Sequence, residues 1–178
     1  MSEPAFRLRR AGPDDAEALA LVGAATFLET FAGVLPGPDI LAHCRAQHAA
    51  ERYAGWLADG CPAWLAEAEG GAPVGYLLLA PPDLPVPTGP GDVEVKRIYA
   101  FSRWHGAGLG RALMDAAADH ARSEGRRRLL VGVYGENARA IAFYRKCGFA
   151  VIGERRFTVG ANTYDDLVLA RPLGEPAS

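Results

Sequence analysis

Hydrophobic and polar residues follow two different periods along this chain. Where they alternate, or where β-branched and aromatic residues gather in a short run, the pattern predicts strands, because successive strand side chains point to opposite faces. Where apolar residues return every three or four positions, the pattern predicts helices. Strands are predicted at residues 6–9, 62–69, 73–80, 93–101, 127–134, 149–159 and 163–171, and helices at 12–31, 38–58, 109–123 and 137–147.

Turn and capping residues mark the boundaries of these elements. Gly70-Gly71 predicts a hairpin between two strands, Asn137 can cap a helix, and Gly125 and Gly148 can end one. Residues 38–58 read as one helix or as two shorter pieces. Residues 81–92 hold five prolines and therefore predict a surface loop inside the domain.

The resulting order is β-α-α-β-β-β-α-β-α-β-β. A chain of 178 residues is long enough for one ordinary domain and too short for two comfortable ones. We therefore expect residues 1–178 to form a single domain of the α/β (α+β) class, with a mixed, twisted sheet flanked by helices.

Composition excludes several classes of protein. The 19 basic and 21 acidic residues give a net charge of −2, which does not favour a nucleic-acid partner. The cysteines at 44, 61 and 147 are odd in number and lack a C-x-x-C pair, as is typical of a reducing compartment. The first ten residues lack the apolar core of a signal peptide, and no apolar run could span a bilayer. We expect a cytoplasmic protein without a membrane partner.

Three glycines at alternate positions, 106, 108 and 110, join a predicted strand to a predicted helix. Unpaired N–H groups at a helix start attract anions, and glycines allow a phosphate to approach them closely. The chain contains no Gly-Lys pair for a Walker loop, and the third position of a G-x-G-x-x-G fingerprint is occupied by Arg111 or Leu113. The turn therefore predicts a phosphate site of another type.

That turn resembles the diphosphate loop of the GCN5-related N-acetyltransferase (GNAT) family, [QR]-x-x-G-x-[GA]. Here it reads HGAGLG, with His105 in place of the usual glutamine or arginine. Residues 93–101, VEVKRIYAF, are similar to the family's fourth strand, and residues 137–149, NARAIAFYRKCGF, to its N-x-x-A-x-x-[FL]-Y-x-K-x-G-F signature. The resemblance implies a mostly antiparallel GNAT-like sheet and an N-acetyltransferase that uses acetyl-CoA and no metal. Dimers are common in such families, so it also implies a homodimer as the state to test.

Three further segments resemble the PaiA-type polyamine acetyltransferases. They are ATFLETFAG at 25–33, VKRIYA at 95–100 and TYDDLVL at 163–169. This finer resemblance implies a primary amine on a small molecule, such as a polyamine, as the acetyl acceptor.

The family resemblance also assigns cofactor contacts. Backbone N–H groups of the glycine turn would bind the diphosphate, the fourth strand would pair with the pantetheine arm as an added strand, and Asn137 and Tyr144 would contact the cofactor. The residues implied are Ile98, Tyr99, Ala100, His105, Gly106, Ala107, Gly108, Leu109, Gly110, Arg111, Asn137 and Tyr144.

Two residues are candidates for acid–base chemistry. Tyr144 lies about two helical turns after Asn137 and is the candidate acid for the departing thiolate; the alternative is a tyrosine that packs beside Phe143. Glu94 is the candidate base, because strand alternation would put it on one face with Ile98 and Ala100. The alternative is an ordinary solvated strand glutamate, paired with Lys96 or with a cross-strand base.

Other polar residues carry weaker signals. His43, Cys44 and His48 cluster without the spacing of a metal site, so no metal is expected. Glu29, Asp165 and Asp166 could attract a cationic acceptor. Two other functions stay open: a non-catalytic acyl-CoA-binding or regulatory module, and an enzyme that acetylates protein N-termini or lysines, which would need a groove open to a peptide.

Overall fold

The computed structural model of this chain describes residues 5–174. Residues 1–4 and 175–178, which carry the ends of the predicted domain and the start of the segment considered as a signal peptide, lie outside the described residues. The strands are β1 Arg7–Arg10, β2 Ala63–Glu67, β3 Pro73–Ala80, β4 Asp92–Ala100, β5 Arg128–Tyr134, β6 Ala150–Val159 and β7 Asn162–Pro172. The helices are α1 Ala16–Phe31, α2 Gly37–Gln47, α3 Ala50–Ala58, α4 Leu109–Ser123 and α5 Ala138–Lys146, with short 3-10 turns η1 Pro13–Asp15 and η2 Ser102–Trp104.

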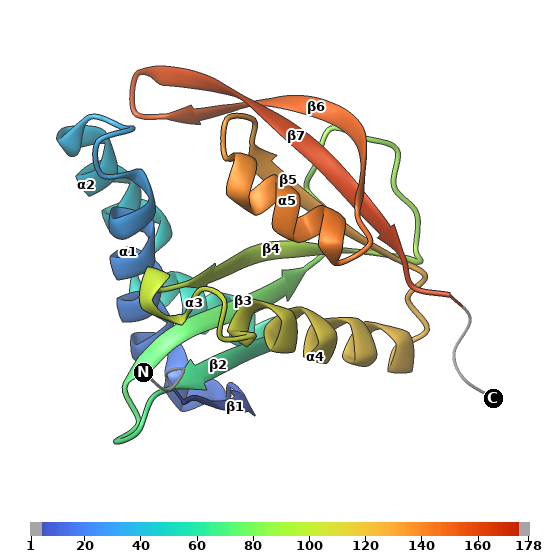
Figure 1. The fold of residues 1–178 in the computed structure, drawn as a ribbon, viewed down its shortest axis with the longest axis horizontal. Coiled ribbons are helices and arrows are strands. Elements are labelled where there is room, and N and C mark those ends of the chain that lie inside the picture. Colours follow the sequence, from blue (N-terminus) through green and yellow to red (C-terminus); the bar gives the residue numbers. More distant parts are fainter. Residues whose placement is uncertain (1–4, 175–178) are drawn as a thin grey trace.

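All described strands join one seven-stranded sheet in the order β1-β2-β3-β4-β5-β7-β6 (Figure 1). Neighbouring strands are antiparallel except β4 and β5, which are parallel. The prediction of a mixed, mostly antiparallel sheet flanked by helices is confirmed. None of the helices within residues 5–174 is both long enough and apolar enough to cross a membrane.

The region 38–58 forms two helices, so three helices precede β2 and the predicted order is corrected on this point. The break falls at His48 and Ala49, where Ala49 adopts an extended backbone with φ −68° and ψ 146°. The predicted cap is confirmed, because the Asn137 side chain accepts a hydrogen bond from the Ala140 N–H at 3.1 Å.

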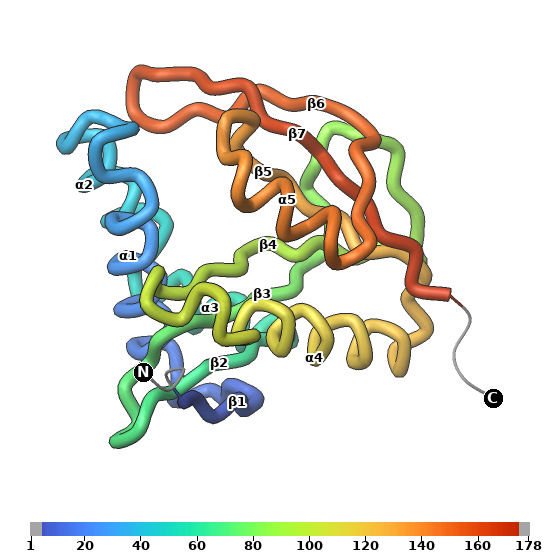
Figure 2. Tube along the Cα trace, in the orientation of Figure 1, coloured from blue at the N-terminus to red at the C-terminus, as the bar shows by residue number. Residues whose placement is uncertain are grey.

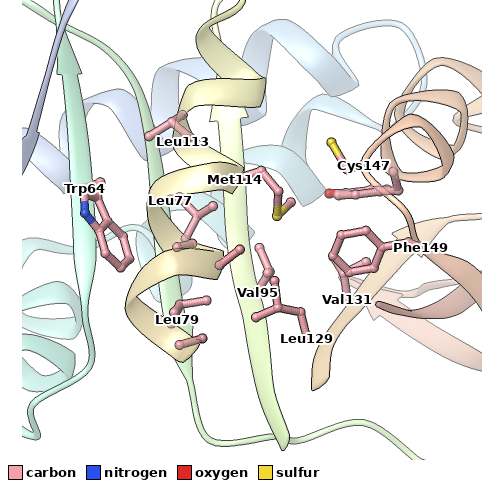
Figure 3. Packing of buried hydrophobic residues seen from close by; sticks show 14 of the residues in the cluster. Trp64, Leu77, Leu79, Val95, Leu113, Met114, Leu129, Val131, Cys147 and Phe149 are labelled. Carbon is pink, nitrogen blue, oxygen red and sulfur yellow. The ribbon is translucent and has the colours of Figure 1, made fainter. Parts of the chain in front are cut away.

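The helices cover both faces of the sheet. α4 and α5 pack on one face, which we call the α4 face; α1 and α3 pack on the other, the α1 face. On the α4 face, fully buried Leu113 and Met114 lie against β3 and β4 residues such as Leu77 and Val95 (Figure 3). These two layers of packing hold β4 rigidly in the middle of the sheet.

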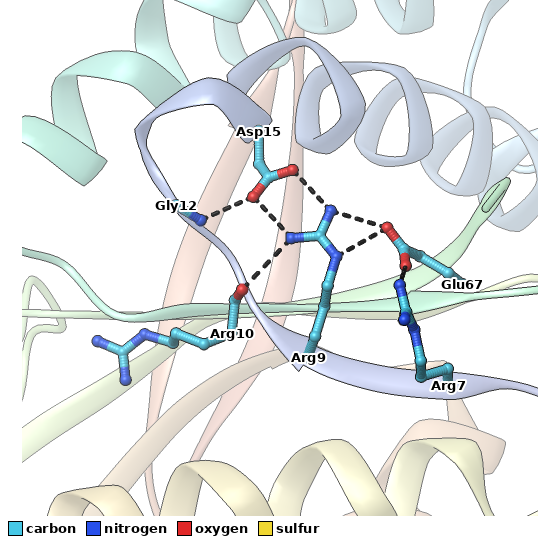
Figure 4. Close-up of polar contacts among 6 residues, drawn as sticks. All are labelled: Arg7, Arg9, Arg10, Gly12, Asp15 and Glu67. Carbon is cyan, nitrogen blue, oxygen red and sulfur yellow. Dashed lines mark hydrogen bonds and ion pairs between the residues drawn. The ribbon is translucent and has the colours of Figure 1, made fainter.

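An arginine-centred network fixes the β1 edge of the sheet (Figure 4). The Arg9 guanidinium donates to Asp15 at 2.7 Å and to Glu67 at 2.9 Å, and Arg7 donates to Glu67 at 3.0 Å. These hydrogen bonds lower the pKa of both carboxyl groups. Charged side chains on a short edge strand also discourage pairing with another chain.

The chain trace separates into two arms at the middle of the sheet (Figure 2). β4 and β5 pair only from Asp92–Arg128 to Glu94–Leu130. We call the segments beyond this last pair, residues 95–100 and 131–134, the β4–β5 fork. The fork leaves the backbone of the second half of β4 without a partner on the β5 side.

Candidate active site

The glycine turn follows β4 and the short 3-10 turn η2, and it opens helix α4. Gly106 and Gly108 have φ values of +86° and +79°, a left-handed conformation that side chains other than glycine adopt only with strain. Gly108 is the residue that caps the start of α4, and no side chain caps this helix. The local sequence therefore makes a turn whose conformation depends on glycine.

The backbone of this turn exposes unpaired donors. Within residues 5–174, no acceptor engages the N–H groups of Gly106, Gly108, Leu109, Gly110 or Arg111, whereas the Ala107 N–H donates to the Trp104 carbonyl at 3.3 Å. A Cβ placed on Gly106 or Gly108 would meet no atom within 4 Å. Open space in front of several unpaired N–H groups at a helix start suits a phosphate anion.

His105 holds this turn to the end of β4. Its Nε2 lies 2.8 Å from the Ala100 carbonyl oxygen, and because a carbonyl only accepts, Nε2 is the donor. The imidazole therefore stabilises the turn through this hydrogen bond.

The unpaired half of β4 can receive an extended ligand. Ile98, Tyr99 and Ala100 lie in the β4–β5 fork, beyond the last parallel pair. An extended chain can add to such an edge through main-chain hydrogen bonds. The hydrogen bond between His105 and the Ala100 carbonyl holds the glycine turn next to this end of the strand, so one ligand could contact both.

A β-bulge in β4 overturns one sequence expectation. Leu78 pairs with Arg97 but Leu79 pairs with Val95, which leaves Lys96 as an extra residue. The extra residue switches the faces to which the following β4 side chains point. Val95 and Ile98 therefore share the α4 face, and the prediction that Glu94 lies on one face with Ile98 and Ala100 is wrong.

Glu94 points to the α1 face and is almost fully buried, with 2% of its surface exposed. Its carboxylate accepts the Asp83 N–H at 2.8 Å and lies 3.5 Å from the Lys96 ammonium. The contact with Lys96 that the alternative expects is therefore present, but the expectation of a solvated glutamate is wrong. Glu94 also ties the proline-rich loop to β4 where the fork begins.

Tyr144 lies on α5 and is buried beside Phe143 and Phe149, with ring centroids at 5.4 and 5.6 Å. Burial raises the pKa of its phenol, and the nearby Tyr99 phenol raises it further. No described residue hydrogen-bonds its hydroxyl. The phenol is therefore protonated over the physiological pH range and is free to donate.

Arg97 and Tyr99 face the α1 side of the fork. Arg97 Nη1 donates to the Gln47 carbonyl at 2.6 Å and to the Tyr53 hydroxyl at 2.7 Å, and lies 3.2 Å from His48 Nδ1. Burial is the main cause that raises the Tyr99 pKa to about 12. Arg97 carries no distinguishing signal in the sequence, because only the fold brings the turn between α2 and α3 against β4.

His43 and His48 lie above these residues without forming a metal site. Burial, and then the charge of Arg97, lowers the pKa of His43 to about 4 and that of His48 to about 3, so both imidazoles are neutral. His43 stacks on Phe27 at 4.3 Å. No group of three or more potential metal ligands occurs within the part of the chain that the structure describes.

The acidic candidates of the sequence analysis lie in different places. Asp166, in β7, is 3% exposed on the α1 face, and its Oδ2 receives the Arg155 guanidinium at 3.1 Å. Glu29 instead accepts the N–H and hydroxyl of Ser102 at 2.9 and 2.8 Å, and Asp165 is exposed. The structure brings only Asp166 to the buried side of the fork.

The β6–β7 hairpin extends over this side and meets α2 (Figure 1). Asn162 donates to Asp39 at 2.6 Å, and Val159 packs with Phe27 and Ile40. The α1 side of the fork is therefore roofed by the hairpin and by α1 and α2.

Comparisons with known proteins agree with this geometry. A model of the acetyltransferase (GNAT) family matches residues 34–149. An uncharacterized N-acetyltransferase of Mycobacterium tuberculosis is 34% identical over 159 residues, which cover 89% of this chain and 98% of that protein. The structure of PaiA N-acetyltransferase from Thermoplasma acidophilum with coenzyme A aligns with a TM-score of 0.77 at 19% identity, over 94% of this chain and 99% of that one. The ribosomal-protein-S18-alanine N-acetyltransferase from Escherichia coli aligns with a TM-score of 0.66 at 19% identity, over 98% and 97% of the two chains.

Proposed function

The chain belongs to the GNAT family of acetyltransferases and is an acetyl-CoA-dependent N-acetyltransferase, and we propose that its acceptor is a primary amine of a small molecule. The roofed α1 side of the fork supports this choice. The contact between Asn162 and Asp39 closes the hairpin onto α2, which suits a compact acceptor better than an extended peptide.

The glycine turn is the observation that supports acetyl-CoA as the cofactor. Its unpaired N–H groups would bind the diphosphate of acetyl-CoA, and glycine at 106 and 108 keeps the space in front of them open. The unpaired edge of β4 at Ile98–Ala100 would pair with the pantetheine arm. Asn137 and Tyr144 would flank the arm from the start and the middle of α5.

The chain supplies three functions for the transfer. Acetyl-CoA provides the acetyl group as a thioester. Glu94, through a water molecule, takes one proton from the ammonium group of the acceptor, so that the neutral amine can attack the carbonyl carbon. A backbone N–H on the open edge of β4 donates to the carbonyl oxygen as charge develops there, which is typically worth about 3 kcal/mol of barrier.

Tyr144 completes the reaction as general acid. The C–N bond forms, the C–S bond breaks, and the tyrosine donates its proton to the leaving sulfur; the second proton of the amine restores the phenol. Burial raises the pKa of Tyr144 and so makes the phenol a weaker acid. The same low-polarity surroundings make the departing thiolate a stronger base, which offsets part of this effect.

The direct test is release of free thiol from acetyl-CoA with a panel of acceptors. The panel includes spermidine, amino acids, aminoglycosides and short peptides, and mass spectrometry identifies the product. Turnover of a small amine with peptides inert supports the proposal. Turnover of peptides alone would favour a protein-modifying enzyme. Tight cofactor binding with no turnover of any acceptor would favour a non-catalytic module.

Further expectations belong to the same proposal. Residues 1–178 would act as one acetyltransferase domain in the cytoplasm, a reducing compartment that keeps free cysteines such as these three as thiols. A polyamine acceptor, as in the PaiA-type resemblance, is one arm of the panel. A homodimer is checked by light scattering.

A further inference from the structure

One cation on the α1 face has no opposite charge. Arg97 is half-buried in β4, and no carboxylate within residues 5–174 comes within 4.0 Å of its nitrogens. Its neighbours on this face are already balanced, since Lys96 lies 3.5 Å from Glu94 and Arg155 lies 3.1 Å from Asp166. The buried side of the fork therefore carries an excess positive charge.

The Arg97 guanidinium is held firmly by neutral groups. All three of its hydrogen bonds, to Gln47, His48 and Tyr53, use Nη1. Its central carbon lies 5.2 Å from the Tyr53 ring and 4.7 Å from the Trp56 ring. This leaves Nε and Nη2 without a partner in the described chain. These two nitrogens form the side of a guanidinium that binds both oxygens of a planar carboxylate.

An unpaired donor, on Arg97, and an unpaired acceptor, on Asp166, lie on opposite sides of the fork. Asp166 Oδ1 is buried and has no hydrogen-bond partner among the described residues. Arg97 lies on the β4 arm of the fork, and Asp166 pairs with Tyr134 at the end of the β5 arm. The charges of both groups also shift the pKa of Tyr99, in opposite directions. A molecule with one negative and one positive group fits this arrangement.

We infer that the acceptor is an amino acid or a closely related amino carboxylate, whose carboxylate binds the Nε–Nη2 side of Arg97 while its ammonium group lies towards Asp166. This inference rests on the proposed function and adds the substrate class. A polyamine offers nothing that could neutralise Arg97. Arg97 is thus a residue that determines specificity.

Matched pairs of acceptors test the inference in the unmodified enzyme. Each amino acid is compared with the amine that lacks its carboxylate: L-methionine with 3-(methylthio)propylamine, L-phenylalanine with phenethylamine, and L-lysine with 1,5-diaminopentane. We expect at least one amino acid to exceed its partner amine in kcat/KM by about 10- to 100-fold, the usual range for hydrogen bonds to a charged group.

Two variants test whether the preference for amino acids depends on Arg97. Arg97→Gln should reduce the ratio of kcat/KM within the pair by about tenfold or more, mainly through KM for the amino acid. Arg52→Gln is the matched control, because Arg52 also lies over the Trp56 ring, at 5.1 Å, but is exposed, and its side chain forms no hydrogen bond with Gln47, His48 or Tyr53. It should leave the ratio unchanged. Calorimetry with coenzyme A checks that both variants retain the cofactor site.

The outcomes separate this inference from the proposed function. Equal or better turnover of the amines overturns the amino-carboxylate assignment and leaves the acetyltransferase proposal standing. Preference for 2-aminoethylphosphonate over every amino acid overturns the assignment of a carboxylate as the group that Arg97 binds. An Arg97→Gln variant that folds and keeps the full ratio overturns the role of Arg97. If Arg97→Gln does not fold, the comparison of each amino acid with its partner amine in the wild-type enzyme still tests the amino-carboxylate assignment. No turnover of any amine would refute the proposed function itself.

Discussion

Replacing Gly108 by alanine tests the glycine turn most directly. Gly108 has φ +79°, and a Cβ there would project into open space in front of the unpaired N–H groups. An L-residue in the left-handed region costs about 1–2 kcal/mol. The alanine methyl group would in addition hold a diphosphate away from the turn.

The expected loss of cofactor affinity follows from the hydrogen bonds at risk. Each hydrogen bond to a charged group contributes about 1.5–3 kcal/mol, so losing one weakens binding by about 10- to 150-fold. Gly125→Ala is the matched control: Gly125 has φ +73°, open space around its Cβ position, and lies just beyond the other end of α4. It should lower stability about as much and leave cofactor affinity unchanged.

Isothermal titration with coenzyme A and urea unfolding give the two readouts. We expect both variants to lose about 1–2 kcal/mol of unfolding free energy and Gly108→Ala alone to lose affinity. If Gly108→Ala binds coenzyme A as tightly as the wild type, or if Gly125→Ala weakens binding equally, the turn does not bind the diphosphate through its backbone.

Four further outcomes are expected. Tyr144→Phe should lower kcat by at least about tenfold with unchanged coenzyme A affinity in calorimetry; unchanged kcat would remove Tyr144 as acid. Glu94→Gln keeps an acceptor for the Asp83 N–H, and should lower kcat/KM about a hundredfold; near-normal values across pH would exclude Glu94 as base. The pKa of His43 falls from 6.5 to about 4 on folding. Between these pH values the unfolded chain therefore binds one proton more than the folded chain, and the free energy of unfolding drops as the pH falls through this window. In urea unfolding, His43→Gln should show a weaker dependence of stability on pH than the wild type, and an equal dependence would contradict this. Leu113→Ala, in the core, should cost about 2–5 kcal/mol, whereas Leu21→Ala, at a site 65% exposed, should cost under about 0.5 kcal/mol in the same assay.

Local signals in the sequence determined much of the fold and the cofactor side of the site. The alternation that predicted the strands, the Asn137 cap and the glycine turn each depend on residues close together in the chain, so their physical causes can be read directly. The sequence does not decide between one helix and two for residues 38–58, because the break at Ala49 has no proline or glycine signal.

Only the tertiary structure decided the acceptor side. The bulge at Lys96 depends on pairing with β3, and it moved Glu94 to the opposite face from Ile98. The lack of a counter-charge at Arg97 is a property of everything that packs around it, including Gln47, which lies fifty positions away in the chain. A sequence shows which charges exist, but the fold decides which of them meet.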